Sequence, residues 1–199
     1  MKTTSICCAG RTIPVYALDA LVVGTGCAGY NAADWLYDLG RTDVAIVTEG
    51  IKMGTSRNTG SDKQTYYKLS LASDEADSVQ EMAQTLFSGG SVNGDTALAA
   101  AAGSVRSFMK LVSLGVPFPC SEYGEYVGYK TDHDPRQRAT SAGPLTSRFM
   151  TEALERSVQK KSIRIFNQMQ AVRLLVEDGQ ACGLLALDRT RAGADGVTP

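Results

Sequence analysis

One stretch near the start of the chain constrains the fold more than any other, namely DALVVGTGCAGYNAADWL at residues 19–36. It reads as a short apolar strand, a turn with the spacing G-x-G-x-x-G, and a helix with apolar residues at helical spacing. DVAIVTE follows as a second apolar strand, a pattern typical of parallel strands buried on both faces. The order strand, glycine turn, helix, strand therefore predicts a parallel βαβ unit. The glycines of the turn are Gly24, Gly26 and Gly29.

Each glycine of this turn has a physical task if the turn binds a dinucleotide. Gly24 permits the tight turn, Gly26 lets the backbone approach a pyrophosphate, and Gly29 lets the helix pack closely on the strand. Glu49 ends the second strand, where a carboxylate can accept hydrogen bonds from ribose hydroxyls. The alternative is a tight strand–helix turn without a ligand. The combination of strand, helix and Glu49 favours a dinucleotide cradle.

The loop after Glu49 bears on which dinucleotide is bound. It reads GIKMGTSRNTGSDKQTYY and is rich in glycine and hydroxyl residues. Small residues let the backbone run along an extended ligand, which suits FAD. An NAD-dependent dehydrogenase would instead continue into a helix, and a solvated surface loop is the simplest alternative.

The remaining chain predicts helices and strands in separate groups. Helices are expected at 73–87, at 96–114 with Asp95 as the N-cap, and at 144–160, with a turn-rich segment at 117–143. Strands are expected at 163–168, 170–178 and 181–188, the last two joined by a turn at Asp178–Gly179, and a hairpin is expected around Ala9–Gly10. We predict an α/β fold: a Rossmann-like domain with a mainly parallel sheet and a small three-stranded β element. The domain would span residues 1–188, followed by a flexible tail at 189–199.

Composition argues against several classes of protein. The net charge of −1 gives no basic surface for nucleic acid, and no apolar run is long enough for a membrane span. The N-terminal residues do not have the pattern of a signal peptide. The five cysteines form no C-x-x-C pair and, with one histidine, suggest neither a disulfide framework nor a metal site. A reduced, cytoplasmic setting is the simplest interpretation.

Charged residues cluster around the single histidine. Asp132 and Asp134 flank His133, and Arg136 and Arg138 follow. This cluster could reach a substrate or a partner domain, or it could be a charged turn held by local ion pairs; the second interpretation is favoured. Cys27 lies in the cradle at a helix N-terminus, where a thiol pKa can fall, but a small packing residue is the favoured interpretation.

Beyond these single motifs, the order of segments resembles the flavoprotein superfamily of fumarate reductase, succinate dehydrogenase and aspartate oxidase. The resemblance covers about residues 11–188 and rests on DALVVGTGCAGYNAA, VAIVTEG, GTSRNTGS, LGVPF, RATSAGPLTSRFMTEAL and VRLLVEDGQACGLLALD. It implies FAD as the cofactor and hydride transfer between the flavin and a small substrate that carries a carboxylate. The implied FAD-binding residues are Gly24, Gly26, Cys27, Ala28, Gly29, Glu49, Gly50, Thr55, Ser56, Asn58, Thr59, Gly60 and, through its backbone, Val172.

Departures from the superfamily pattern qualify what the resemblance implies. Some members carry near Asn58 a histidine that bonds covalently to the flavin; because asparagine cannot, FAD is expected to be non-covalent. The chain resembles only the N-terminal FAD-binding part, so the capping domain with the substrate-binding and catalytic residues is expected to lie outside it. The expected partners are the small-molecule substrate and either the remaining part of the flavoenzyme or an electron-transfer protein. The alternatives are a truncated or partner-dependent nucleotide-binding chain without catalysis of its own, and an NAD-dependent dehydrogenase domain.

Overall fold

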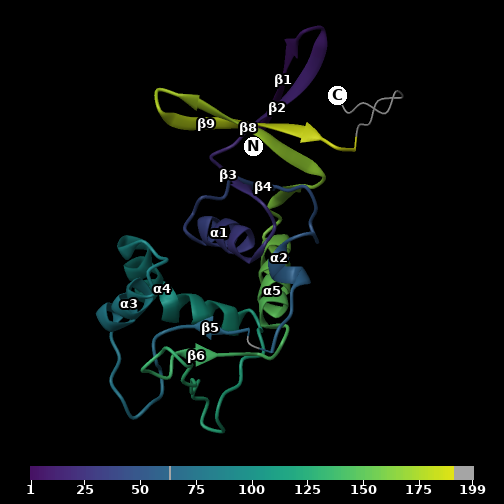
Figure 1. Cartoon of the computed structure of the whole chain (residues 1–199). Helices are drawn as coiled ribbons and strands as arrows, with labels where there is room; N and C mark the ends of the chain where they lie inside the picture. Colours follow the sequence, from purple (N-terminus) through teal and green to yellow (C-terminus); the bar gives the residue numbers. More distant parts are fainter. Residues whose placement is uncertain (63, 191–199) are drawn as a thin grey trace. The chain divides into compact units, whose positions relative to one another are not determined.

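The structure is a computed structural model that describes residues 1–62 and 64–190 (Figure 1). The chain forms two compact units, residues 1–58 with the chain from Leu154 onward, and residues 59–153. Most of the tail expected at 189–199 lies outside the described residues.

The first unit is built on a parallel sheet in the order β3-β4-β7. The strands are β3 (Ala20–Val23), β4 (Val44–Val47) and β7 (Arg164–Phe166), and helix α1 (Cys27–Asp38) connects β3 to β4. The predicted strand–turn–helix–strand order is confirmed. Every residue of β4 is buried, as its apolar run predicts, because β4 is the central strand. The same expectation is wrong for β3: Leu21 and Val23, which point to the same face of the sheet, are exposed, so the described residues do not cover that face at β3.

Two antiparallel hairpins complete the strands of this unit. β1 (Lys2–Cys8) pairs with β2 (Arg11–Ala17), and β8 (Met169–Glu177) pairs with β9 (Gln180–Asp188). Both hairpin turns were predicted. The prediction of a three-stranded element near the C-terminus is wrong. β7 pairs with the buried strand β4, and among the described strands β8 and β9 pair only with each other.

The second unit packs two helices and a short two-stranded sheet. α3 (Val79–Ser88) packs on α4 (Gly94–Ser113), and β5 (Tyr66–Tyr67) pairs with β6 (Ala139–Thr140). Phe108 and Phe118 lie at the centre, with ring centroids 4.8 Å apart. The segment 117–143 is turn-rich, as predicted.

Two helix starts differ from the sequence-based expectation. α3 begins after Ser78, whose hydroxyl accepts a hydrogen bond from the Glu81 amide, so residues 73–77 precede the helix. α4 is capped by Asn93, whose side chain accepts hydrogen bonds from the amides of Asp95 and Thr96, and Asp95 therefore lies inside the helix.

Two further helices concern the site. α2 (Thr55–Asn58) is a four-residue helix within the loop expected after Glu49. α5 (Thr146–Lys160) starts two residues after Pro144 and runs from the second unit into the first, where Leu154 and Val158 are buried.

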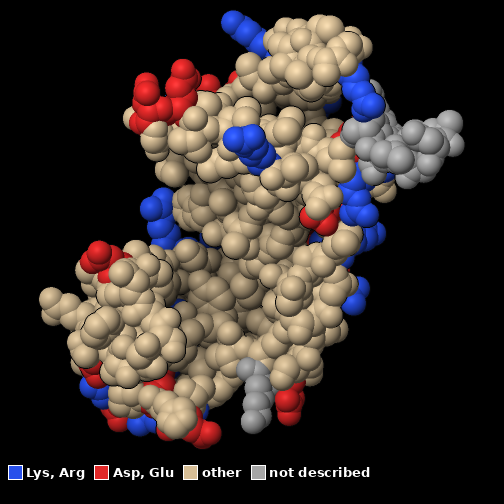
Figure 2. All heavy atoms as spheres, turned by 45° about the horizontal axis from the view of Figure 1, so that its top comes forward, with Lys and Arg blue, Asp and Glu red and all other residues tan. Residues whose placement is uncertain are grey.

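The surface shows no dominant charge on the face drawn in Figure 2, where basic and acidic side chains lie interspersed. Among the residues described, no helix has both the length and the apolar character needed to cross a membrane. The same residues contain no group of three or more His, Cys, Asp or Glu side chains suited to a metal ion.

Candidate dinucleotide site

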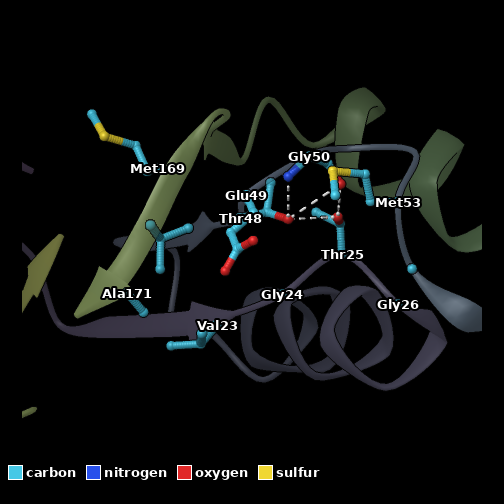
Figure 3. A pocket seen from close by; sticks show the side chains of 12 residues that line it. Val23, Gly24, Thr25, Gly26, Thr48, Glu49, Gly50, Met53, Met169 and Ala171 are labelled. Atoms are coloured by element: carbon cyan, nitrogen blue, oxygen red, sulfur yellow. Dashed lines mark hydrogen bonds between the residues drawn. The ribbon is translucent and has the colours of Figure 1, made fainter. Parts of the chain in front are cut away.

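The predicted glycine turn lines a pocket at the carboxyl ends of β3 and β4 (Figure 3). In parallel α/β sheets, ligands bind at this end of the strands. The pocket has a volume of about 290 Å³. Its lining residues are Val23, Gly24, Thr25, Gly26, Val47, Thr48, Glu49, Gly50, Met53, Gly54, Met169 and Ala171.

Gly24 and Gly29 have the structural tasks that the motif predicts. Gly24 has a φ of +98°, a conformation that residues with a side chain rarely adopt, and its amide donates to the Val47 carbonyl over 2.8 Å. A Cβ on Gly29 would lie 2.1 Å from the Gly24 carbonyl oxygen. The first turn of α1 can therefore approach the end of β3 only because residue 29 has no side chain.

Gly26 leaves the N-terminus of α1 accessible. It is the N-cap residue and has no side chain that could cap the helix amides. A Cβ there would meet only Ser56 Oγ, at 3.7 Å, and therefore has room. The amide of Cys27 donates to the same Ser56 Oγ over 3.4 Å. Helix N-termini favour anions because their first amides lack partners within the helix and point outward.

A pair of buried threonines joins the two strand ends beneath the pocket. The hydroxyls of Thr25 and Thr48 lie 2.9 Å apart and both contact the Gly50 carbonyl, at 3.2 and 3.4 Å. The Gly50 amide in turn donates to Thr48 Oγ1 over 3.3 Å. This network fixes the segment after β4 against the glycine turn. Neither threonine was predicted as a site residue, although both lie just after an apolar strand, where ligand-binding residues are expected in this fold.

Glu49 presents the acidic group of the pocket. Its carboxylate is half-exposed and lies 3.8 Å from the guanidinium of Arg189. It follows β4 directly, as the sequence predicts. An accessible carboxylate beside a helix N-terminus suits a ribose whose phosphates sit on the helix amides.

Apolar side chains form the rest of the lining. Met53 and Met169 lie on different sides of the pocket in Figure 3, with Ala171 on β8. Ala171 lines the pocket, and the side chain of Val172, the next residue of β8, is exposed. The β8–β9 hairpin has a register shift between Ala171 and Arg173, which leaves Val172 as the extra residue.

The structure brings together part of the predicted residue set. Gly24, Gly26, Glu49 and Gly50 line the pocket. Cys27, Ala28 and Gly29 form the adjoining first turn of α1, while Thr55, Ser56 and Asn58 form α2. Thr59 and Gly60 begin the second unit, where a Cβ on Gly60 would contact Leu145 at 3.2 Å.

A buried charged cluster lies behind α1 and α2. Arg57 of α2 forms an ion pair with Glu155 of α5, and the two side chains are 11% and 12% exposed. Tyr30 of α1 is fully buried, and its burial, together with the nearby Glu155 carboxylate, raises the pKa of the phenol to about 12. Tyr30 therefore stays neutral at physiological pH, and Arg57 carries the charge that matches Glu155.

The charged cluster around His133 belongs to the second unit and is held by ion pairs. Arg138 is fully buried and donates to Asp77 over 2.6 and 2.9 Å and to Asp134 over 3.1 Å. Arg136 pairs with Glu75 at 2.8 Å. The ion pairs are not only local, as predicted for a charged turn, because two of the partners, Glu75 and Asp77, come from the segment before α3.

The fold and pocket together define the class: an α/β domain with a dinucleotide-type glycine turn. The sequence profile of the FAD binding domain matches residues 19–196, nearly the whole chain, and the chain belongs to this family. FAD is thus the cofactor of its family. A search of curated proteins found no match.

Solved flavoenzyme structures share the fold. Sdh1 of Mycobacterium smegmatis, in complex with UQ1, aligns with a TM-score of 0.75 at 19% identity over 89% of this chain and 32% of that chain. E. coli quinol fumarate reductase aligns with a TM-score of 0.71 at 19% identity, over 86% of this chain and 29% of that chain. A 3-ketosteroid dehydrogenase of Rhodococcus jostii, in complex with 4-androstene-3,17-dione, aligns with a TM-score of 0.65 at 18% identity. The alignment covers 85% of this chain and 41% of that chain. The chain thus spans about a third of the length of these proteins.

Proposed function

We propose that the pocket at the ends of β3 and β4 holds the ADP portion of FAD. The observation that carries this proposal is the open backbone at Gly26, beside the uncapped first turn of α1 and the accessible Glu49 carboxylate. In this arrangement the amides of Ala28 and Gly29 face the pyrophosphate, beside the Cys27 amide and the Ser56 hydroxyl to which it donates. Glu49 accepts hydrogen bonds from the adenosine ribose. The residues present fit the cofactor.

The remaining site residues surround this ADP portion. Gly50 and the backbone at Ala171 and Val172 would flank the adenosine, with Met53 and Met169 as apolar walls. Thr55, Ser56 and Asn58 of α2 would follow the pyrophosphate toward the flavin, and Thr59 and Gly60 continue the same loop. A pocket of about 290 Å³ encloses only part of an extended dinucleotide, so the flavin extends beyond it.

Binding at Asn58 would be non-covalent. Its side-chain amide donates to the carbonyls of Lys52 and Gly54, over 2.6 and 3.1 Å, and so holds the loop closed. An amide nitrogen engaged in this way offers no nucleophile for the flavin.

The wider proposal is a flavin-dependent oxidoreductase of which this chain is the FAD-binding portion. When bound, FAD supplies the hydride-transfer chemistry, and the protein contributes binding and orientation. The substrate class proposed is a small molecule with a C–C or C–N bond next to a carboxylate, as the resemblance of the sequence segments to the fumarate reductase superfamily implies. Cytoplasmic location stays a prediction.

Two alternatives make different predictions. An NAD-dependent dehydrogenase would have a full helix directly after Glu49, whereas α2 is four residues long and begins only at Thr55. A chain that binds FAD without catalysis of its own would hold the cofactor but show no substrate-dependent flavin reduction.

Equilibrium titration with FAD, ADP, FMN and NAD tests the proposed site. We expect FAD and ADP to bind, and FMN, which lacks the adenosine portion, to bind much more weakly. Glu49→Gln should weaken FAD and ADP alike, because the ribose loses an acceptor. Glu177→Gln, at the exposed hairpin end, is the matched control. Binding of FMN equal to that of FAD, or no effect of Glu49→Gln, would overturn the assignment of this pocket to the ADP portion.

A further inference from the structure

We infer that Arg57 and Glu155 act as a positioning pair that holds α2 against the N-terminus of α1. The pair thereby fixes Ser56 beside the amides proposed to bind the pyrophosphate. This inference rests on the proposed FAD site, and it adds two residues that neither touch the pocket nor belong to the glycine motif.

α2 needs an anchor outside itself. A helix of four residues is too short to be stable alone in water. The Arg57–Glu155 ion pair joins α2 to α5 and is almost entirely buried. Breaking such a pair from one side leaves an uncompensated buried charge, so it holds its two elements together strongly.

α5 is itself attached to α1, so α1 and α2 are fixed to the same helix. Ser157 donates to the buried Asp34 carboxylate over 2.6 Å. Lys161, just after α5, pairs with Asp34 at 2.8 Å and with Asp38 at 2.6 Å. The Arg57–Glu155 pair is therefore the link that completes a path from α1 through α5 to α2.

The contacts of α2 with the glycine turn show what this link positions. Ser56 Oγ accepts a hydrogen bond from the Cys27 amide over 3.4 Å. A Cβ on Gly54 would lie 3.1 Å from the Cα of Gly26, so the two backbones are in close contact. A displacement of α2 would therefore move Ser56 away from the first turn of α1 and open the pocket on that side.

The charges also favour an anionic ligand. With Tyr30 neutral, Arg57 is the cation that balances Glu155. Removal of Arg57 would leave the buried Glu155 carboxylate without this ion-pair partner. Arg57→Gln should therefore weaken FAD more than Glu155→Gln, although both variants release α2.

Limited proteolysis tests the anchor without any ligand. Lys52 is exposed at the base of the loop that α2 closes, and trypsin cleavage after it requires the loop to open. We expect cleavage after Lys52 to rise at least about tenfold in Arg57→Gln and in Glu155→Gln, because each variant leaves its buried partner without a counter-charge. The control is Arg148→Gln, which breaks an exposed ion pair with Glu152 on the same helix. Cleavage unchanged from wild type would overturn the inference.

FAD titration of the same variants tests the consequence. We expect affinity to fall about tenfold or more in Arg57→Gln, and the charge-exchanged double variant Arg57→Glu with Glu155→Arg to recover part of both losses. Circular dichroism confirms that each variant is folded, and the double variant keeps the test valid if a single variant is not. Weaker FAD binding with unchanged cleavage would also overturn the inference, because the pair would then not act through the loop. Absence of FAD binding by the wild-type chain would instead overturn the proposed function, while cleavage would still show whether the pair holds α2.

Discussion

The carbonyl oxygen of Gly24 occupies the space that a side chain on Gly29 would need, since a Cβ there would lie 2.1 Å away. These two backbones therefore set how closely α1 approaches the end of β3. Their contact fixes the direction in which the first amides of α1 point. The proposed phosphate site depends on that direction.

We expect Gly29→Ala to destabilise the chain by about 1–3 kcal/mol, the cost of forcing a methyl group into a packed contact. Chemical denaturation measures the loss. Gly103→Ala is the control, because a Cβ at that helical position has no atom within 4 Å. If Gly29→Ala were as stable as the wild type, the close approach of Gly29 to the Gly24 carbonyl would be contradicted.

Gly26→Val should show the opposite behaviour, with little change in stability and a large loss of FAD affinity. A first carbon at Gly26 fits, because its nearest neighbour is Ser56 Oγ at 3.7 Å, but the additional methyl groups would occupy the approach to the α1 amides. Denaturation and FAD titration of one preparation separate the two effects. A stability loss as large as that of Gly29→Ala would mean that Gly26 serves packing rather than the ligand.

The buried pair of Arg138 and Asp77 should make the second unit sensitive to acid. Burial raises the pKa of the Asp77 carboxyl, but hydrogen bonds from Arg138 and from the amides of Ser70 and Ser78 outweigh it and lower the pKa overall. Its stabilisation is therefore complete above the unfolded pKa of about 3.9 and is lost as the pH falls through the lower folded value.

Asp77→Asn should cost about 3–5 kcal/mol near neutral pH, because Arg138 would stay buried without its main partner. The loss should shrink toward acid pH, where wild-type Asp77 also loses its charge. Denaturation of both chains over a series of pH values measures this. Glu152→Gln is the control, since its exposed pair with Arg148 contributes little. If the difference in the free energy of unfolding between Asp77→Asn and the wild type stayed constant with pH, the stabilisation would not come from the ionised Asp77 carboxylate.

Lys68 should give the opposite pH dependence. It is fully buried, with its ammonium 5.0 Å from the centre of the Phe108 ring and 3.5 Å from the Leu69 carbonyl. Burial lowers the pKa of the Lys68 amine. The unfolded chain therefore binds more protons between the folded value and about 10.4, and stability rises with pH across that range.

Lys68→Met should raise the free energy of unfolding near neutral pH by roughly 1–3 kcal/mol, since it removes the cost of burying the charge while filling the same space. It should also flatten the rise in stability with alkaline pH. Urea unfolding at neutral and alkaline pH measures both effects. Lys160→Met, at the exposed end of α5, is the control. Destabilisation by Lys68→Met would show that the contact with Phe108 outweighs the burial cost.

The sequence predicted the parts of the fold and site that depend on local pattern. The strand, glycine turn and helix around Gly24 follow from apolar runs and backbone freedom, and Glu49 follows from its place at the end of a strand. The start of α3 also had a local signal, since Ser78 and Glu81 have the spacing of a helix N-cap, but the acidic residues before Ser78 favoured an earlier start. Asp77 lies just before the N-cap Ser78 and pairs with Arg138, 61 residues away, and no local pattern predicts such a partner.

Strand pairing and register also depend on distant contacts. The apolar segment of β7 resembles its neighbours β8 and β9 in sequence, yet it joins β4 across more than a hundred residues. The extra residue at Val172 in the β8–β9 pairing has no sequence signature here, because a bulge depends on the partner strand. Arg57 of α2 and Glu155 of α5, which form an ion pair, are likewise 98 residues apart in the sequence.

The most direct test of the central claim is the absorbance spectrum of the purified chain after incubation with excess FAD and removal of free cofactor. We predict that flavin bands remain with the wild-type chain and with Gly103→Ala, and that they are lost with Gly26→Val. Acid precipitation should then release the flavin into solution, as expected of non-covalent binding. A folded wild-type chain that retains no flavin, but binds NAD in a parallel titration, would contradict the claim that this pocket is an FAD site.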